Sequence, residues 1–221
     1  MVLFPGFLSD LSEPGRLDGL TYGLLGSLIG HEISHAFDSE GISRNGDGIV
    51  GEQWRDDVTK KVFDRQVRRI EEHYGNLTLE GAFAKVNGTT TRNENMADIT
   101  GELLAYRAYL RLREKVGGEE PGLQIPLQTG NRVQGPVLSA RQLFWVSYAS
   151  CYCSAYSPEM IDAELLLDRD DAHLPNYYRV TGSLMNLKEF AAAFSCPSGS
   201  YMNPTQKILV WGSGTNDVQG D

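Results

Sequence analysis

Residues 21–36 read TYGLLGSLIGHEISHA, and this stretch is the most informative part of the sequence about the fold. Its apolar residues recur every three or four positions, which predicts a mostly buried helix over these residues. Three glycines interrupt the pattern. Because a glycine inside a helix costs about 1 kcal/mol against alanine, these glycines indicate close packing against a neighbouring element.

Near the end of this stretch, His31 and His35 are four residues apart, so both imidazoles project from one face of the helix. Imidazole nitrogens bind zinc at about 2.0–2.1 Å, and two of them at this spacing fill two corners of a tetrahedral site. Glu32 lies one step round the helix, where it reaches a metal-bound water without binding the metal. The alternative is a structural helical protein in which the HExxH pattern arose by chance.

A catalytic zinc takes three protein ligands, so a third must come from elsewhere. The best donor is Glu94, in the segment ENMAD at residues 94–98. Asp98 falls on the same face of the expected helix one turn later, where it is placed to accept the second ring N–H of a ligand histidine. The alternative is that both acids only complement the positive end of a helix dipole, as surface carboxylates commonly do.

Length and charge narrow the class of protein. The chain has 221 residues, a formal charge of −9 and 41% hydrophobic residues, which suits about one soluble globular domain. The negative charge argues against a nucleic-acid partner or an anionic membrane surface. The apolar run at residues 24–29 is too short to cross a bilayer, and the chain does not open like a signal peptide. We therefore expect no membrane segment in this chain, and either a cytosolic protein or a true N-terminus upstream.

The cysteines and two sequons leave questions open. Cys151, Cys153 and Cys196 are an odd number and cannot all pair with one another. The triplets beginning at Asn76 and Asn87 match the N-glycosylation signal, which is used only in secreted proteins and also arises by chance. Disulfide pairing and glycosylation therefore stay undecided at this point.

The periodicity predicts a mainly α-helical chain with few short strands. The expected helices span residues 21–36, 51–73, 93–115, 139–155, 158–165 and 187–194. Residues expected on inner faces of the second, third and fourth of these helices are Trp54, Val58, Val62, Val67, Ile70, Leu103, Leu104, Ala108, Leu112, Leu143, Phe144, Val146 and Tyr148. Residues 45–48, NGDG, resemble part of a calcium loop but lack its closing glutamate, so we expect a turn. Residues 212–221 lack apolar anchors and are expected to form a disordered tail.

These motifs resemble those of the neprilysin and endothelin-converting-enzyme family, the M13 zinc metalloendopeptidases. Residues 30–38, GHEISHAFD, are similar to the family's HEITHGFD, and residues 94–98 are similar to its ENIAD. The likeness extends from about Thr21 to Trp211. It implies that residues 1–211 are the C-terminal part of a peptidase catalytic domain, the helical part of a thermolysin-like (gluzincin) fold.

The same resemblance implies a complete catalytic site. His31, His35 and Glu94 would hold one Zn²⁺ per chain, with Glu32 as general base and Asp98 as a supporting catalytic residue. Residues 171–180, DAHLPNYYRV, are similar to the family's DVHSPGNFRIIG. By that likeness His173 steadies the oxyanion, Asp171 keeps it charged and Arg179 grips a substrate carbonyl, which suits the large catalytic effect of cationic donors. Without the resemblance, His173 would be taken for a surface histidine.

The resemblance also bears on substrate and disulfides. Leu28, Cys151 and Tyr152 would lie near the pocket after the scissile bond and imply a preference for apolar side chains. Ile208 stands where the family has a cysteine, and Arg69 stands where its disulfide partner is expected. Both halves of that bridge are therefore missing together. Cys153 and Cys196 match family cysteines whose partners lie in an N-terminal segment outside this sequence.

The sequence thus predicts a zinc-dependent endopeptidase that hydrolyses small peptides and is extracellular or at the cell surface. We expect the chain alone to be weakly active or inactive, because the family's substrate-aligning strand and second helical domain are not in it. The alternative is a catalytically silent truncated homologue that acts as a binding or decoy module.

Overall fold

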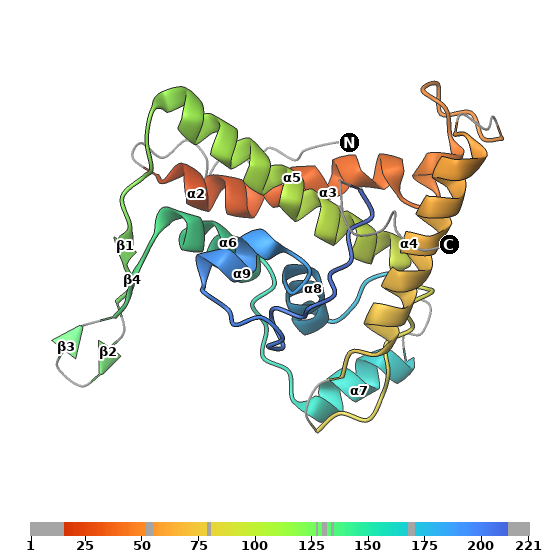
Figure 1. Ribbon diagram of the computed structural model, residues 1–221. Coiled ribbons are helices and arrows are strands. Elements are labelled where there is room, and N and C mark those ends of the chain that lie inside the picture. The colour runs from red at the N-terminus through yellow and green to blue at the C-terminus, as the bar shows by residue number, and fades with distance from the viewer. Residues whose placement is uncertain are drawn as a thin grey trace.

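The computed structural model describes residues 16–51, 55–78, 81–126, 128–129, 132–133, 135–167 and 171–211. Helices make up most of it (Figure 1), which confirms the predicted mainly α-helical fold with few short strands. The expected tail at residues 212–221 lies outside the described residues, and the division of the chain at residue 211 stays a prediction.

The histidine motif ends a helical rod built from three consecutive segments, α2 (Asp18–Thr21), the π-helical η2 (Tyr22–Gly26) and α3 (Ser27–Ser34). A 3₁₀ turn, η3 (His35–Phe37), follows directly. The predicted helix over residues 21–36 therefore begins slightly earlier than expected. In Figure 1 this rod lies across α5 (Arg92–Val116), which is the helix that carries ENMAD.

Two glycines set the distance between α3 and α5. A Cβ built on Gly101 would lie 2.3 Å from the backbone nitrogen of His31, and one built on Gly30 would lie 2.4 Å from the carbonyl oxygen of Gly101. The two backbones are therefore in direct contact at this crossing. Because His31 follows Gly30 directly, this contact brings the metal motif onto α5, as the predicted close packing required.

The other helices lie mainly to one side of this pair (Figure 1). They are η4 (Gly41–Ser43), α4 (Asp57–Gly75), α6 (Ala140–Ser150), α7 (Pro158–Leu167), α8 (Asn176–Leu184) and α9 (Lys188–Ala193). Two antiparallel pairs of two-residue strands project from the helical body (Figure 1): β1 (Leu123–Gln124) with β4 (Val137–Leu138), and β2 (Gln128–Thr129) with β3 (Arg132–Val133). Local signals explain two helix starts, since Asp56 caps α4 and Ser139 with Gln142 forms a capping box on α6.

Aromatic packing joins α5 to α6 in the core. Tyr106, Tyr109, Phe144 and Trp145 are all buried, and the rings of Tyr106 and Trp145 lie 4.7 Å apart between centroids. Such pairs stabilise by about 0.5–1.5 kcal/mol beyond the area that they bury. This cluster supports the part of α5 that lies beyond the metal motif.

Several expected inner faces are wrong. Val58, Val62, Leu104, Ala108 and Val146 are exposed, whereas α4 buries residues from Phe63 onward. All of residues 57–62 are exposed, so the start of α4 meets no core. Periodicity shows which residues share a face but not where that face meets another element. Trp54, also expected inside, lies outside the described residues.

Helix boundaries and one helix also differ from expectation. The second helix begins at Asp57, not near residue 51, and the fourth ends at Ser150, not near residue 155. Helix α8 was not predicted, because its sequence NYYRVTGSL contains Val180, Thr181 and Gly182, which are weak helix formers. The turn predicted at residues 45–48 is present, with Gly48 at φ 78°.

Candidate metal centre

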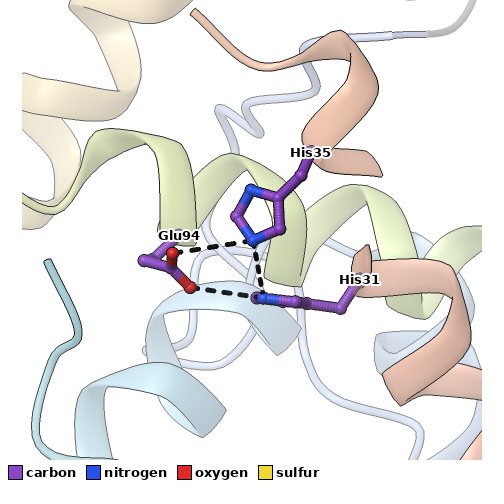
Figure 2. A group of neighbouring side chains, drawn as sticks. All are labelled: His31, His35 and Glu94. Carbon is purple, nitrogen blue, oxygen red and sulfur yellow. Dashed lines mark hydrogen bonds and ion pairs between the residues drawn. The ribbon is translucent and has the colours of Figure 1, made fainter. Parts of the chain in front are cut away.

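Three side chains converge where the end of α3 and the start of η3 meet the first turn of α5 (Figure 2). His31 Nε2 lies 3.2 Å from Glu94 Oε2, and His35 Nε2 lies 3.5 Å from Glu94 Oε1. The two Nε2 atoms are 3.1 Å apart. The donor atoms of all three residues lie within 4.8 Å of one another, so the structure brings the three predicted ligands to one point.

Each histidine is held from behind by a carboxylate. His31 Nδ1 lies 2.8 Å from Asp98 Oδ1, and His35 Nδ1 lies 2.8 Å from Asp38 Oδ2. Asp38 is itself fixed by the backbone N–H groups of Glu40 and Gly41. Asp38 was not predicted as a site residue, although its place three residues after His35 was a usable signal. A carboxylate that accepts from Nδ1 leaves Nε2 as the metal-binding atom.

The donor set fits a divalent metal such as zinc. With both Nδ1 atoms donating to carboxylates, the two neutral imidazoles direct Nε2 lone pairs at each other across 3.1 Å, which is unfavourable without a shared cation. Glu94 Oε2 is buried, and the Nε2 atoms of His31 and His173 both lie 3.2 Å from it, so imidazole nitrogens surround the carboxylate. Two imidazoles and one carboxylate are a common ligand set for catalytic zinc.

Hydrogen bonds and burial shift the pKa values of these groups in the metal-free protein. Burial lowers the pKa of His31, but hydrogen bonds to Asp98 and Glu94 outweigh it and raise the pKa to about 9. The hydrogen bond to Asp38 raises the pKa of His35. Burial acts to raise the pKa of Asp98, yet His31 and Arg179 hold it below its usual range.

Arg179 enters the centre from α8. Its Nε and Nη2 donate to the two carboxylate oxygens of Asp98 at 2.9 and 2.7 Å. Its guanidinium carbon also lies 4.8 Å from the ring centroid of Tyr152, within the range of a cation–π contact. The residue predicted to grip substrate is thus also the counter-ion of the buried Asp98, a contact that the sequence pattern does not predict.

His173, in the loop before α8, contacts the carboxylate of Glu94. Its Nε2 lies 3.2 Å from Glu94 Oε2, and its Nδ1 lies 3.1 Å from Asp171 Oδ1. Asp171 also accepts from the backbone N–H of His173. The predicted pair of Asp171 and His173 therefore lies beside the convergence point. The His173 side chain is half exposed there.

A cavity of about 530 Å³ opens beside these groups. Glu32 lines it together with the three residues expected near the substrate pocket, Leu28, Cys151 and Tyr152. The remaining lining residues are Leu24, Ser27, His31, Tyr148, His173 and Arg179. The lining thus combines apolar and aromatic side chains with an acid, two histidines and an arginine.

The sequence profile of Peptidase family M13 matches residues 13–210. The chain belongs to this family. Neprilysin-1 of Caenorhabditis elegans is 40% identical over 192 residues, and endothelin-converting enzyme 1 of Bos taurus is 38% identical over 194 residues. These alignments cover 87% and 88% of this chain and 24% of each relative. The resemblance drawn from the motifs is therefore confirmed.

Solved structures agree with this M13 assignment. The zinc metalloprotease Zmp1 of Mycobacterium tuberculosis, solved in complex with an inhibitor, superposes with a TM-score of 0.71 at 25% identity. The match covers 90% of this chain and 29% of Zmp1. The M13 chain described here thus spans about a quarter of the length of the relatives it matches, and it is placed among the metallopeptidases.

This M13 chain departs from the family likeness at its cysteines. Arg69 Nη2 donates to the carbonyl oxygen of Lys207 at 3.3 Å, next to the buried Ile208. The two segments that the family's disulfide would join are therefore adjacent and linked by a hydrogen bond. All three cysteines are free thiols. No helix in the described ranges is both long and apolar enough to cross a membrane.

Proposed function

We propose that this chain forms the zinc centre of an endopeptidase that hydrolyses small peptides outside the cell or at its surface. The observation that carries the proposal is the convergence of His31, His35 and Glu94, whose donor atoms lie within 4.8 Å of one another. A bound zinc ion would polarise the scissile carbonyl and acidify a water. Peptides are accordingly the proposed partners.

The residues of the chain would divide the remaining work. Asp98 and Asp38 hold the imidazoles so that both Nε2 atoms face the same point. Glu32, on the cavity wall, would take a proton from the attacking water and return it to the leaving amine. His173, on the same cavity, would donate to the oxygen on which negative charge develops, and Arg179 would grip a backbone carbonyl of the substrate.

Metal binding tests the centre. Elemental analysis of the purified chain should find about one zinc per molecule, with a Glu94→Gln variant that binds it far more weakly. Glu114→Gln is a matched control, because Glu114 is exposed near the other end of α5. A folded wild-type chain that takes up no zinc would overturn the proposed centre.

Catalysis needs a separate test. Glu32→Gln should retain zinc and lose cleavage of fluorogenic peptides, measured in the longest form of the protein that can be made. Retained cleavage in that variant would contradict the role of Glu32 as general base. A wild-type protein that cleaves no peptide and binds no hydroxamate would instead favour the catalytically silent binding module.

A further inference from the structure

Helix α5 carries a third acid on the face that holds Glu94 and Asp98. Glu102 follows Asp98 by four residues, so it lies one helical turn deeper in the protein. Its exposed fraction is only 1%. The metal centre uses the first two acids and leaves Glu102 without a role.

The positive charge near Glu102 is already paired with another acid. The nearby cation is Arg179, and both of its described hydrogen bonds go to Asp98. Neither carboxyl oxygen of Glu102 makes a hydrogen bond of ordinary geometry within the described part of the chain. A buried carboxylate without a paired cation is very costly, and such a group takes up a proton instead. Burial and the neighbouring Asp98 accordingly raise the pKa of Glu102 well above its usual value.

The groups that face Glu102 belong to three helices besides its own. The hydroxyls of Tyr148 on α6 and Ser183 on α8 are its polar neighbours. The other titratable or charged groups that act on it or respond to its charge are Asp98 on α5, Arg179 on α8, Tyr74 on α4, and Tyr152 just after α6. Only one of these groups is a cation.

The two hydroxyls connect Glu102 to the backbone of Arg179. Ser183 Oγ donates to the carbonyl oxygen of Arg179 at 2.5 Å. The Tyr148 hydroxyl lies 3.4 Å from that same carbonyl oxygen and 3.4 Å from Ser183 Oγ. Glu102 therefore abuts the pair of hydroxyls that holds the residue whose guanidinium binds Asp98.

We propose that Glu102 is a positioning residue: an uncharged buried acid that supports the Tyr148 and Ser183 hydroxyls and thereby holds Arg179 on Asp98. An ionised acid one turn from Asp98 would compete with it for Arg179, and Asp98 would then hold His31 less firmly. The effect on peptide cleavage rests on the proposed function. The protonation state and the placement of Arg179 do not.

Stability measured against pH tests the uncharged state in zinc-free protein. The pKa of Glu102 is higher in the folded state than in the unfolded state, so its stabilising contribution is complete at low pH and is lost as pH rises above about 4.5. Glu102→Gln keeps the shape and cannot ionise. The melting temperature of this variant should therefore gain several degrees on the wild type between pH 4.5 and pH 8.

Other titrating groups cancel in this comparison because both proteins share them. Glu114→Gln, the exposed control on α5, should show a difference that is flat with pH. A flat or falling difference for Glu102→Gln would show that Glu102 is ionised in the fold, and would overturn the proposal. This result does not depend on whether the chain cleaves peptides.

The positioning role needs a readout at Arg179 itself. In ¹⁵N NMR spectra, its Nε–H signal should be slow to exchange in the wild type and in Glu102→Gln, because the bond to Asp98 persists. Glu102→Leu fills the space without supporting the hydroxyls and should speed that exchange at least tenfold. Equal exchange in all three proteins would refute the positioning role, and so would fast exchange in a folded Gln variant. If the Leu variant does not fold, the Gln comparison still decides.

Discussion

Asp38 and Asp98 determine which nitrogen of each histidine faces the metal position. Each carboxylate lies 2.8 Å from an Nδ1 atom, which leaves Nε2 free to bind a metal ion. Asp38→Asn replaces an obligate acceptor with an amide that can turn its NH₂ toward the ring. We expect zinc affinity to fall by about 10–100-fold, the range found for such supporting groups.

Competition with a fluorescent chelator measures this loss of affinity. Asp47→Asn is the matched control, because Asp47 is an exposed residue in the following loop and does not contact the histidines. Unchanged zinc affinity in Asp38→Asn would show that His35 keeps its orientation without help from a carboxylate.

His31 makes the stability of the zinc-free protein depend on pH. Its pKa rises from 6.5 to about 9 in the folded state, so the stabilisation is complete below pH 6.5 and is lost as pH increases through 9. At about 1.4 kcal/mol per pKa unit this is roughly 3 kcal/mol. Chemical denaturation of chelator-treated protein should show this loss between pH 6.5 and 9, whereas stability that stays level across this range would contradict the elevated pKa.

At the scale of elements, the crossing of α3 and α5 decides whether the ligands meet. Gly101→Ala would place a Cβ 2.3 Å from the backbone of His31, and two helix backbones have no flexible end that can give way. The helices must separate, so we expect a loss of at least 2 kcal/mol in unfolding free energy and a marked loss of zinc affinity.

Calorimetry and metal analysis check this prediction together. Gly75→Ala is a matched helical control, because its new Cβ would come no closer than 4.0 Å to Val86. Full zinc occupancy in Gly101→Ala would mean that the distance between the helices does not control the centre.

At the scale of the whole molecule, the segment around Lys207 is held against α4 without a disulfide. Arg69 reaches the carbonyl of Lys207, beside the position where the family likeness places a cysteine. Replacing Arg69 and Ile208 together by cysteine should restore a crosslink. Because the bridge would close a loop of more than 100 residues, chain entropy sets an upper gain of about 5 kcal/mol.

Peptide mapping under non-reducing conditions identifies the bond, and melting temperatures with and without reductant measure its effect. The single variant Arg69→Cys controls for pairing with one of the native thiols. If the double variant stays reduced under oxidising conditions, the two backbones are too far apart for a disulfide.

The sequence by itself determined the fold class and the identity of the candidate ligands. Two histidines four residues apart share a helix face because local backbone hydrogen bonds set the helical repeat, whatever the helix packs against. The glycines of the motif helix also predicted close packing, because a glycine inside a helix is unfavourable unless another element needs the space. Family likeness then added His173 and Arg179, which share one cavity with Glu32.

Only the tertiary structure decided how these parts meet. The contact between Arg179 and Asp98 joins residues 81 positions apart through a helix that the sequence pattern does not predict. The same holds for the burial of Glu102 and for the exposure of Val58 and Val62. These features depend on which faces pack against one another, and helical periodicity carries no information about the partner. The backbone contact at Gly30 and Gly101, not the motif alone, therefore brings the three candidate ligands to one point.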